Sequence, residues 1–291
     1  MRTSSDAAVT NATDPLAKPL AAVLERAVPD YVALKNVERL SGGASQETYR
    51  LTLDTKSGEL LLAMRRAPGG GTDEPRPENY PGLDVEAKLM QAAAAAGVPE
   101  PEVVHVLKPE DGIGEGFIMQ WLDGEALGAR IARAPGFAKL REHLAYDCGR
   151  MLAKIHAIDL DVTGLRDDLS LTEPAEFVEQ TWARYRDYPT PQPMIDYTAR
   201  WLLAHLPDNF KPALVHNDFR NGNFMVNEQE MVAVLDWEIA HIGDPMRDLG
   251  WICTNSWRFG VAELPVGGFG SREDLFRGYA DESGTDVDAD R

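Results

Sequence analysis

The chain has 291 residues and carries 47 acidic against 29 basic side chains, which gives a formal net charge of −18 at neutral pH. Because such a charge repels nucleic-acid phosphates and anionic lipids, the composition argues against general nucleic-acid binding and against a membrane-surface protein. Hydrophobic residues make up 44% of the chain, which is enough apolar material for a real core.

The cysteine content and the absence of long apolar runs indicate the compartment. Cys148 and Cys253 are too few for a disulfide framework, and both lie in apolar stretches, so we expect buried thiols in a reducing environment. Residues 1–11 are polar, unlike a signal peptide, and no run approaches the roughly 18 apolar residues that span a bilayer. These features predict a cytoplasmic protein without a membrane partner.

Residues 1–30 are predicted to form a polar tail followed by one helix. Asp14 and Pro15 are typical of an N-cap and a first helical residue, and apolar residues then recur at helical spacing up to Pro29. A different pattern follows over residues 31–122. Short strands are predicted there over residues 37–40, 48–53, 59–65, 103–107 and 116–122.

The first three of these strands are consecutive, which predicts an antiparallel meander. After a loop rich in Pro and Gly, a helix is predicted over residues 84–96, where five alanines follow one another. Residues 123–291 are mainly helical in pattern. Helices are predicted over residues 144–158, within residues 172–206 and from Asp248 onward, with short strands over residues 213–216, 224–226 and 232–235. The sequence therefore predicts an α+β protein with a small β-rich lobe and a larger helical lobe.

Residues suited to phosphoryl transfer lie around the last three strands. The segment from His216 to Asn223 reads H-N-D-F-R-N-G-N, and Asp236 follows the strand at 232–235. If the strands flanking Asn223 and Asp236 pair, both side chains emerge at one end of a hairpin, where their hard oxygens suit Mg²⁺. Asp218 is then placed to accept a proton from a hydroxyl, and Arg220 to approach a phosphate. Singly, each residue is more typical of turn and capping chemistry, but the ordered set favours phosphoryl transfer.

The motifs H-x-D-x-x-x-x-N and D-x-[E/G] resemble the catalytic and metal loops of the protein-kinase-like superfamily. Together with the downstream G-D-P-M-R-D-L, they resemble the aminoglycoside phosphotransferase family, in the subgroup that includes the kinase-like domain of some acyl-CoA dehydrogenases. The resemblance covers about residues 38–260. It implies a protein-kinase-like two-lobed fold, with an antiparallel β-sheet N-lobe over residues 31–122 and a mainly helical C-lobe over residues 123–291. It also implies ATP as co-substrate, with GTP as an alternative, together with Mg²⁺ and a small-molecule hydroxyl acceptor.

By position in these motifs, the resemblance implies that Asp218 is the catalytic base and that Arg220 contacts the γ-phosphate. It implies that Asn223 and Asp236 are the magnesium ligands. His216 is expected to hold the loop by packing, and Asp248 is expected to bond to the amides of the catalytic loop. One departure is Asn217, where the family usually has Gly; Asn tolerates unusual backbone angles better than most residues.

The resemblance also implies a nucleotide site in the N-lobe. Arg65 occupies the place of the phosphate-binding lysine, and Glu86 that of its helical partner, with an ordinary solvated charge as the alternative for Glu86. The glycine-rich loop is replaced by Ser41-Gly42-Gly43-Ala44-Ser45, of which Ser41, Gly42, Gly43 and Ser45 are expected to cover the phosphates. Main-chain groups of Gln120 and Leu122 are expected to bind the adenine, although an ordinary strand end fits these two residues equally well.

Several alternatives remain open from the sequence. A catalytically weak nucleotide-binding module competes with the kinase, because Arg65 replaces a lysine. The acceptor is either an aminoglycoside or a metabolite such as a hydroxyacyl-CoA, and the oligomeric state is undetermined. Relatives usually continue with further helices, so the chain is either a short form or truncated. His156 is expected to be a packed helical histidine, and Trp251 and Trp257 are expected to be core residues more often than ligand contacts.

Overall fold

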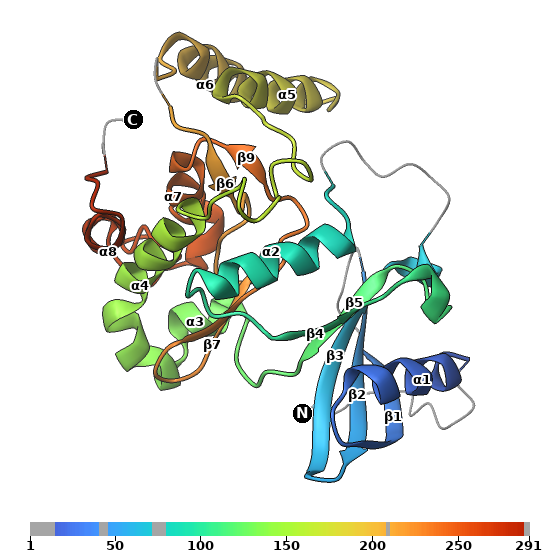
Figure 1. The fold of residues 1–291 in the computed structure, drawn as a ribbon. Coiled ribbons are helices and arrows are strands. Elements are labelled where there is room, and N and C mark those ends of the chain that lie inside the picture. Colours follow the sequence, from blue (N-terminus) through green and yellow to red (C-terminus); the bar gives the residue numbers. More distant parts are fainter. Residues whose placement is uncertain (1–14, 41–45, 72–79, 208–209, 288–291) are drawn as a thin grey trace. The chain divides into compact units, whose positions relative to one another are not determined.

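A computed structural model describes residues 15–40, 46–71, 80–207 and 210–287 (Figure 1). The chain divides into two compact units. The N-terminal unit comprises Met1–Ala95 and Pro99–Gly124, and the C-terminal unit comprises Ala96–Val98 and Glu125–Arg291.

A five-stranded antiparallel sheet forms the frame of the N-terminal unit (Figure 1). In spatial order its strands are β1 (Tyr31–Leu40), β2 (Glu47–Thr55), β3 (Gly58–Arg66), β5 (Gly116–Gln120) and β4 (Val103–Val106). Strands β2 and β3 stay in register along their whole length, up to the pair Thr55 and Gly58. Gly58 has a φ of 124°, a backbone angle that glycine adopts without strain, so this residue allows the tight connection.

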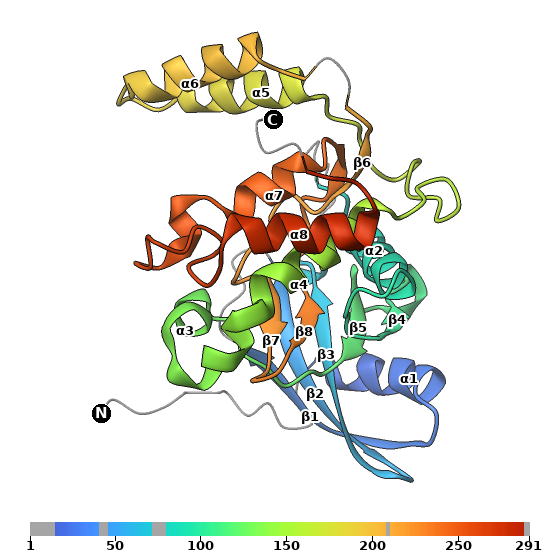
Figure 2. The same cartoon turned by 90° about the vertical axis from the view of Figure 1, so that its left-hand side faces the viewer.

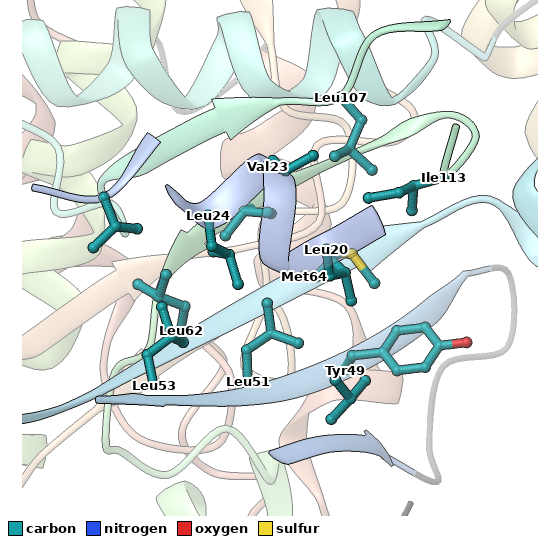
Figure 3. Packing of buried hydrophobic residues seen from close by; sticks show 13 residues of the cluster. Leu20, Val23, Leu24, Tyr49, Leu51, Leu53, Leu62, Met64, Leu107 and Ile113 are labelled. Atoms are coloured by element: carbon teal, nitrogen blue, oxygen red, sulfur yellow. The ribbon is translucent and has the colours of Figure 1, made fainter. Parts of the chain in front are cut away.

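One face of the sheet packs against α1 (Ala17–Ala27) (Figure 3). The helix presents its apolar residues at i, i+3 and i+4, and the strands present alternate residues, so the two patterns meet in one core. This core includes Leu20, Val23 and Leu24 of the helix and Leu51, Leu53, Leu62 and Met64 of the sheet.

A second helix, α2 (Leu83–Ala95), packs against β4 and β5. Met64 belongs to the core with α1, and successive strand residues point to opposite faces. Arg65 therefore points away from α1, and it forms an ion pair with Glu86 of α2. Strand β3 is thus the element that places a cation on the side of the sheet away from the main apolar core.

The C-terminal unit is mainly helical. Its helices are α3 (Gly128–Arg133), α4 (Ala138–His156), α5 (Pro174–Arg186), α6 (Pro193–Ala204), α7 (Met246–Ile252) and α8 (Arg272–Ser283). Helices α4 and α8 lie side by side (Figures 1 and 2). A Cβ atom on Gly278 would lie 2.0 Å from the carbonyl oxygen of Tyr146, and one on Gly149 would lie 2.0 Å from that of Leu275. The two glycines therefore let these helix backbones touch.

Two short antiparallel ribbons in this unit carry the loops of interest. Strand β6 (Ala213–Val215) pairs with β9 (His241–Gly243), and β7 (Phe224–Val226) pairs with β8 (Met231–Val234). The predicted pairing of the strands next to Asn223 and Asp236 is confirmed, with the second strand one residue earlier. Strand β9 was not predicted, because its sequence, His-Ile-Gly, lacks the apolar run that marks the other short strands.

Other element ends differ from the predicted ones for local reasons. Strand β1 begins at Tyr31 instead of residue 37, because register shifts between Tyr31 and Ala33 and between Leu34 and Asn36 break the alternation. Helix α4 begins at Ala138 instead of residue 144, because its first turns are polar. Short 3₁₀ turns, which were not predicted, occur at Pro68–Gly70, Pro109–Asp111, Pro135–Phe137 and Asn255–Arg258. Within the described ranges, no helix combines the length and the apolar character that a bilayer crossing requires.

Candidate active site

The candidate catalytic loop joins β6 to β7 and is held from inside by His216. This side chain is fully buried, packs against Phe219 and Trp237, and makes a hydrogen bond through Nε2 to the carbonyl oxygen of Leu235, 3.1 Å away. Burial lowers the pKa of His216, which favours the neutral imidazole. His216 therefore links the loop to the segment that follows β8, as expected for a holding residue.

Asn217 has a φ of 69°, the left-handed conformation in which a glycine is usual. Its side chain explains the asparagine, because it binds two other segments. The Nδ2 group donates to the carbonyl oxygen of Ile239 at 3.3 Å, and Oδ1 accepts a hydrogen bond from Arg247. The departure from the family pattern thus adds contacts that a glycine would not make.

Asp248, at the start of α7, clamps the backbone of this loop. Its Oδ2 and Oδ1 accept hydrogen bonds from the amides of His216 and Asn217, at 2.9 and 2.8 Å. The carboxylate is completely buried, which by itself raises its pKa. The hydrogen bond and charge of His156 and the contacts with His216 outweigh burial, so the pKa of Asp248 lies below its usual value.

His156, at the end of α4, completes this buried network. Its Nε2 lies 3.1 Å from Oδ2 of Asp248, and its Nδ1 lies 3.0 Å from the hydroxyl oxygen of Tyr279 on α8. The expectation of a packed helical histidine is confirmed, but no local pattern indicated its partner, 92 residues away. Three helices, α4, α7 and α8, thus meet at the carboxylate that fixes the catalytic loop.

Asp218 follows Asn217 in the loop, and both of its carboxylate oxygens accept hydrogen bonds. Its Oδ1 accepts from Trp251 Nε1 at 2.7 Å and from Arg220 Nε at 3.2 Å. Its Oδ2 accepts from Asn223 Nδ2 at 2.5 Å. A carboxylate held in this way has a defined orientation, which is what a proton acceptor needs.

Arg220 lies against Asp218 and an aromatic ring. Besides its bond to Asp218, its guanidinium carbon lies 4.2 Å from the ring centroid of Trp257, an arrangement that favours the cation. An added Cβ on Gly222 would lie 2.2 Å from the Nη1 atom of Arg220, so this glycine leaves room for the guanidinium. The structure therefore brings Arg220 to the same carboxylate that the sequence singled out.

Asn223 and Asp236 flank the paired ends of β7 and β8. The amide of Leu235 donates to the carbonyl oxygen of Asn223 at 2.8 Å, which holds the two segments together. Because Asn223 Nδ2 donates to Asp218, its Oδ1 is the atom left to face a cation. Asp236, two residues after the end of β8, adopts a φ of 70°. The two hard oxygen donors fit a magnesium ion that takes its remaining ligands from phosphates and water. No group of three or more His, Cys, Asp or Glu side chains suited to a metal occurs among the residues that the structure describes.

The N-terminal unit contains the other predicted positions. Arg65 Nη1 lies 2.6 Å from Glu86 Oε1, and both side chains are largely buried. Gln120 ends β5, where its amide donates to the carbonyl oxygen of Glu102 at 2.8 Å, and Leu122 follows two residues later. The predicted phosphate-covering residues Ser41, Gly42, Gly43 and Ser45 lie outside the described residues.

Arg247, on α7, is a site residue that the sequence did not indicate. Its Nη1 lies 2.7 Å from His241 Nε2, and its guanidinium carbon lies 3.2 Å from the ring centroid of Phe177 on α5. Burial lowers the pKa of Arg247 to about 10, which still leaves it charged near neutral pH. Arg247 therefore connects the catalytic loop, through Asn217, to a helix from a different part of the C-terminal unit.

Comparison with known proteins agrees with this geometry. A family model described as the phosphotransferase enzyme family, APH, matches residues 36–282. Mouse acyl-CoA dehydrogenase family member 10 is 31% identical over 220 residues, which are 72% of this chain and 19% of that protein. Chicken acyl-CoA dehydrogenase family member 11 is 31% identical over 242 residues, 81% of this chain and 30% of that protein. The chain thus spans less than a third of the length of these relatives.

A solved structure supports the fold assignment. The crystal structure of a candidate aminoglycoside phosphotransferase from Ralstonia eutropha JMP134 has a TM-score of 0.73 and 26% sequence identity to this chain. The match covers 93% of this chain and 81% of the other. The predicted protein-kinase-like α+β fold is therefore confirmed.

Proposed function

The chain belongs to the APH phosphotransferase enzyme family, and from this premise we propose that it transfers the γ-phosphate of ATP to a hydroxyl group of a small molecule. The observation that carries the proposal is the hydrogen-bonded carboxylate of Asp218 on a loop clamped by Asp248. Phosphoryl transfer depends mainly on positioning and charge neutralisation, and this loop is built for positioning.

In the proposed reaction, Asp218 orients the acceptor hydroxyl and accepts its proton. The hydroxyl oxygen forms the new bond to the γ-phosphorus, the bond from this phosphorus to the bridging oxygen breaks, and ADP leaves with the electron pair. Arg220, 3.2 Å from Asp218, is close enough to turn its guanidinium toward the transferred phosphate. GTP in place of ATP would leave these roles unchanged.

Asn223 and Asp236 would hold Mg²⁺ through their side-chain oxygens. When bound, this ion neutralises charge on the nucleotide phosphates. In the N-terminal unit, Arg65 would bind a phosphate of the nucleotide, and Glu86 would fix its direction. Ser41, Gly42, Gly43 and Ser45 would cover the phosphates, and main-chain groups of Gln120 and Leu122 would bind the adenine, as the family resemblance implies.

Two classes of compound are candidates for the acceptor. The Ralstonia structure points to aminoglycosides, whereas the names of the mouse and chicken relatives point to acyl-CoA metabolism. The chain contains two cysteines, both free in the structure, and we place the reaction in the reducing cytoplasm. The alternative function is nucleotide binding without efficient catalysis, which Arg65 in place of a lysine favours.

The test measures ADP formation from Mg-ATP with and without a panel of aminoglycosides, choline, homoserine and a hydroxyacyl-CoA. We expect one acceptor class to stimulate turnover, and Asp218→Asn to lower kcat by about 10² to 10⁴-fold while nucleotide affinity changes little. Removal of the metal with EDTA is expected to abolish turnover. Asp187→Asn, at an exposed position after α5, is the matched control.

Each contrary outcome has a distinct meaning. Tight Mg-ATP binding without turnover on any acceptor would favour the binding module. No binding of either ATP or GTP would contradict both functions. Equal turnover by the wild type and Asp218→Asn would show that Asp218 is not the base.

A further inference from the structure

Trp251 contacts the proposed catalytic base, although the sequence favoured a core residue at this position. It lies on α7, 33 residues after Asp218, and its indole Nε1 donates to Asp218 Oδ1 at 2.7 Å. We propose that Trp251 is a positioning residue that holds the carboxylate of Asp218 in the orientation required for phosphoryl transfer. This inference rests on the function proposed above.

The first argument is the place of Trp251 on α7. Asp248, three residues earlier on the same helix, accepts hydrogen bonds from the amides of His216 and Asn217. Residues three apart on a helix share a face. Helix α7 therefore contacts the loop at two points: Asp248 binds its main-chain amides, and Trp251 binds the side chain of Asp218. One short helix therefore fixes both the path of the loop and the direction of its carboxylate.

The second argument is the pattern of hydrogen bonds at the carboxylate. A carboxylate has about four positions for donors. Oδ1 accepts from Trp251 and Arg220, and Oδ2 accepts from Asn223. Counting the donors of the described residues, the remaining position is on Oδ2, and this is where an acceptor hydroxyl is expected to donate. When Arg220 turns toward a phosphate, Trp251 is the donor that keeps Oδ1 in place.

The third argument is the chemistry of the indole group. An indole N–H donates a hydrogen bond and accepts none, so it cannot take a proton from Asp218 or compete with it as a base. A hydrogen bond to a charged carboxylate is also stronger than one between neutral groups. The ring of Trp251 packs edge-on against Trp257, with centroids 5.4 Å apart. The guanidinium of Arg220 lies over the ring of Trp257. The same aromatic pair thus supports both charged side chains of the loop.

The exposure of Trp251 agrees with a role at the site. Its relative exposure is 38%, so the prediction of a core residue is wrong at this position. The donor therefore lies at the surface of its unit, next to the carboxylate that an acceptor must reach.

The contact is tested directly by the indole N–H signals of the protein labelled with ¹⁵N-tryptophan. The chain has six tryptophans, and the signal of Trp251 is the one lost in Trp251→Phe. We expect this signal to move upfield in Asp218→Asn by more than any other indole signal, because the charged acceptor has been removed. An unchanged Trp251 signal would overturn the inference, and this measurement requires no turnover.

The role in catalysis is tested by steady-state kinetics of Trp251→Phe, which keeps the ring but removes the donor. We expect kcat to fall about tenfold while the KM for nucleotide stays within about twofold. Trp201→Phe, on α6 and 47% exposed, is the matched control and is expected to keep the wild-type kcat. Equal thermal unfolding of the two variants excludes loss of fold as the cause.

The outcomes separate this inference from the proposed function. A wild-type enzyme that turns over and a Trp251→Phe variant with the same kcat would overturn the positioning role alone. A wild-type protein without turnover on any acceptor would overturn the proposed function, while the indole signal still decides whether Trp251 binds Asp218. A shifted signal together with a lower kcat supports the inference.

Discussion

At the scale of single residues, Asp248 combines charge, burial and two backbone contacts. Its exposed fraction is 0%, and its oxygens accept from two amides of the catalytic loop and lie within hydrogen-bond distance of His156. Desolvation of a carboxylate is costly unless donors replace the lost water, and here they do. The pKa of this carboxyl is lower in the folded protein than in the unfolded chain. Its contribution to stability is therefore present above the pKa of the unfolded state and is lost as the pH falls through the pKa of the folded state.

Asp248→Asn should therefore destabilise the protein more than an ordinary loss of charge. An asparagine keeps one acceptor oxygen but places an NH₂ group where the second amide of the loop needs an acceptor. We expect the free energy of unfolding to fall by about 3 kcal/mol, the order found when one partner of a buried charged network is removed. Urea denaturation measures this change. Asp187→Asn, at an exposed position after α5, should change stability by less than about 0.5 kcal/mol, and an equal effect of both variants would contradict the clamp.

At the scale of elements, the approach of α4 and α8 depends on glycines. Gly278 faces the carbonyl oxygen of Tyr146, where an added Cβ would lie only 2.0 Å away, so Gly278→Ala forces backbone atoms apart. We expect a loss of about 1–3 kcal/mol in the free energy of unfolding, as for other overpacked sites. Because α8 also carries Tyr279, which contacts His156, the change should reach the network around Asp248.

Gly250, in the middle of α7, is the matched control for this substitution. An added Cβ there has no atom within 4 Å, so Gly250→Ala should be neutral or stabilising by up to about 1 kcal/mol, the gain in helix propensity. Thermal or urea unfolding of Gly278→Ala and Gly250→Ala compares the effect of packing on stability with the effect of helix propensity. A loss of stability in Gly250→Ala equal to that in Gly278→Ala would show that glycine packing does not hold α4 against α8.

Elements with a strong local pattern were the ones that the sequence predicted. The alternating strand at residues 48–53, the alanine-rich helix at 84–96 and the apolar strand at 224–226 all occur in the structure, with ends shifted by up to two residues. The irregular β1 and β9, whose sequence is His-Ile-Gly, lack such patterns. Motif order placed Asp218, Arg220 and Asn223 on one loop, and the structure shows these three in contact.

The contacts that sequence reasoning missed join segments far apart in the chain. Trp251 and Asp218 are 33 residues apart, and His156 and Asp248 are 92 residues apart. Such pairs leave no periodic signal, because nothing in the local sequence of either residue depends on its partner. The left-handed backbone conformation of Asp236 could not be predicted either, because Asp is an ordinary residue at the end of a strand. Tertiary packing, and not local propensity, determines these features.

At the scale of the whole molecule, the net charge of −18 opposes compaction at neutral pH. Moderate acidification reduces this repulsion, so stability is not expected to fall until paired carboxylates gain protons. Asp111 is such a group in the N-terminal unit. It is nearly fully buried and binds Arg26 of α1, 85 residues away in sequence, at 2.6 Å and His105 of β4 at 2.8 Å.

Asp111 is therefore expected to set part of the acid sensitivity of the N-terminal unit. Burial raises its pKa, but the hydrogen bonds from His105 and the Lys108 amide and the charge of Arg26 outweigh this effect, so the pKa lies below the ordinary value of 3.8. Its stabilisation is complete above about pH 5, and it is lost as the pH falls through the unfolded pKa and then the folded pKa. Measured between pH 7 and 2, the free energy of unfolding of Asp111→Asn should be lower than that of the wild type at neutral pH and should decline less steeply below pH 4. Parallel curves for the two proteins below pH 4 would show that Asp111 is not a source of the acid sensitivity.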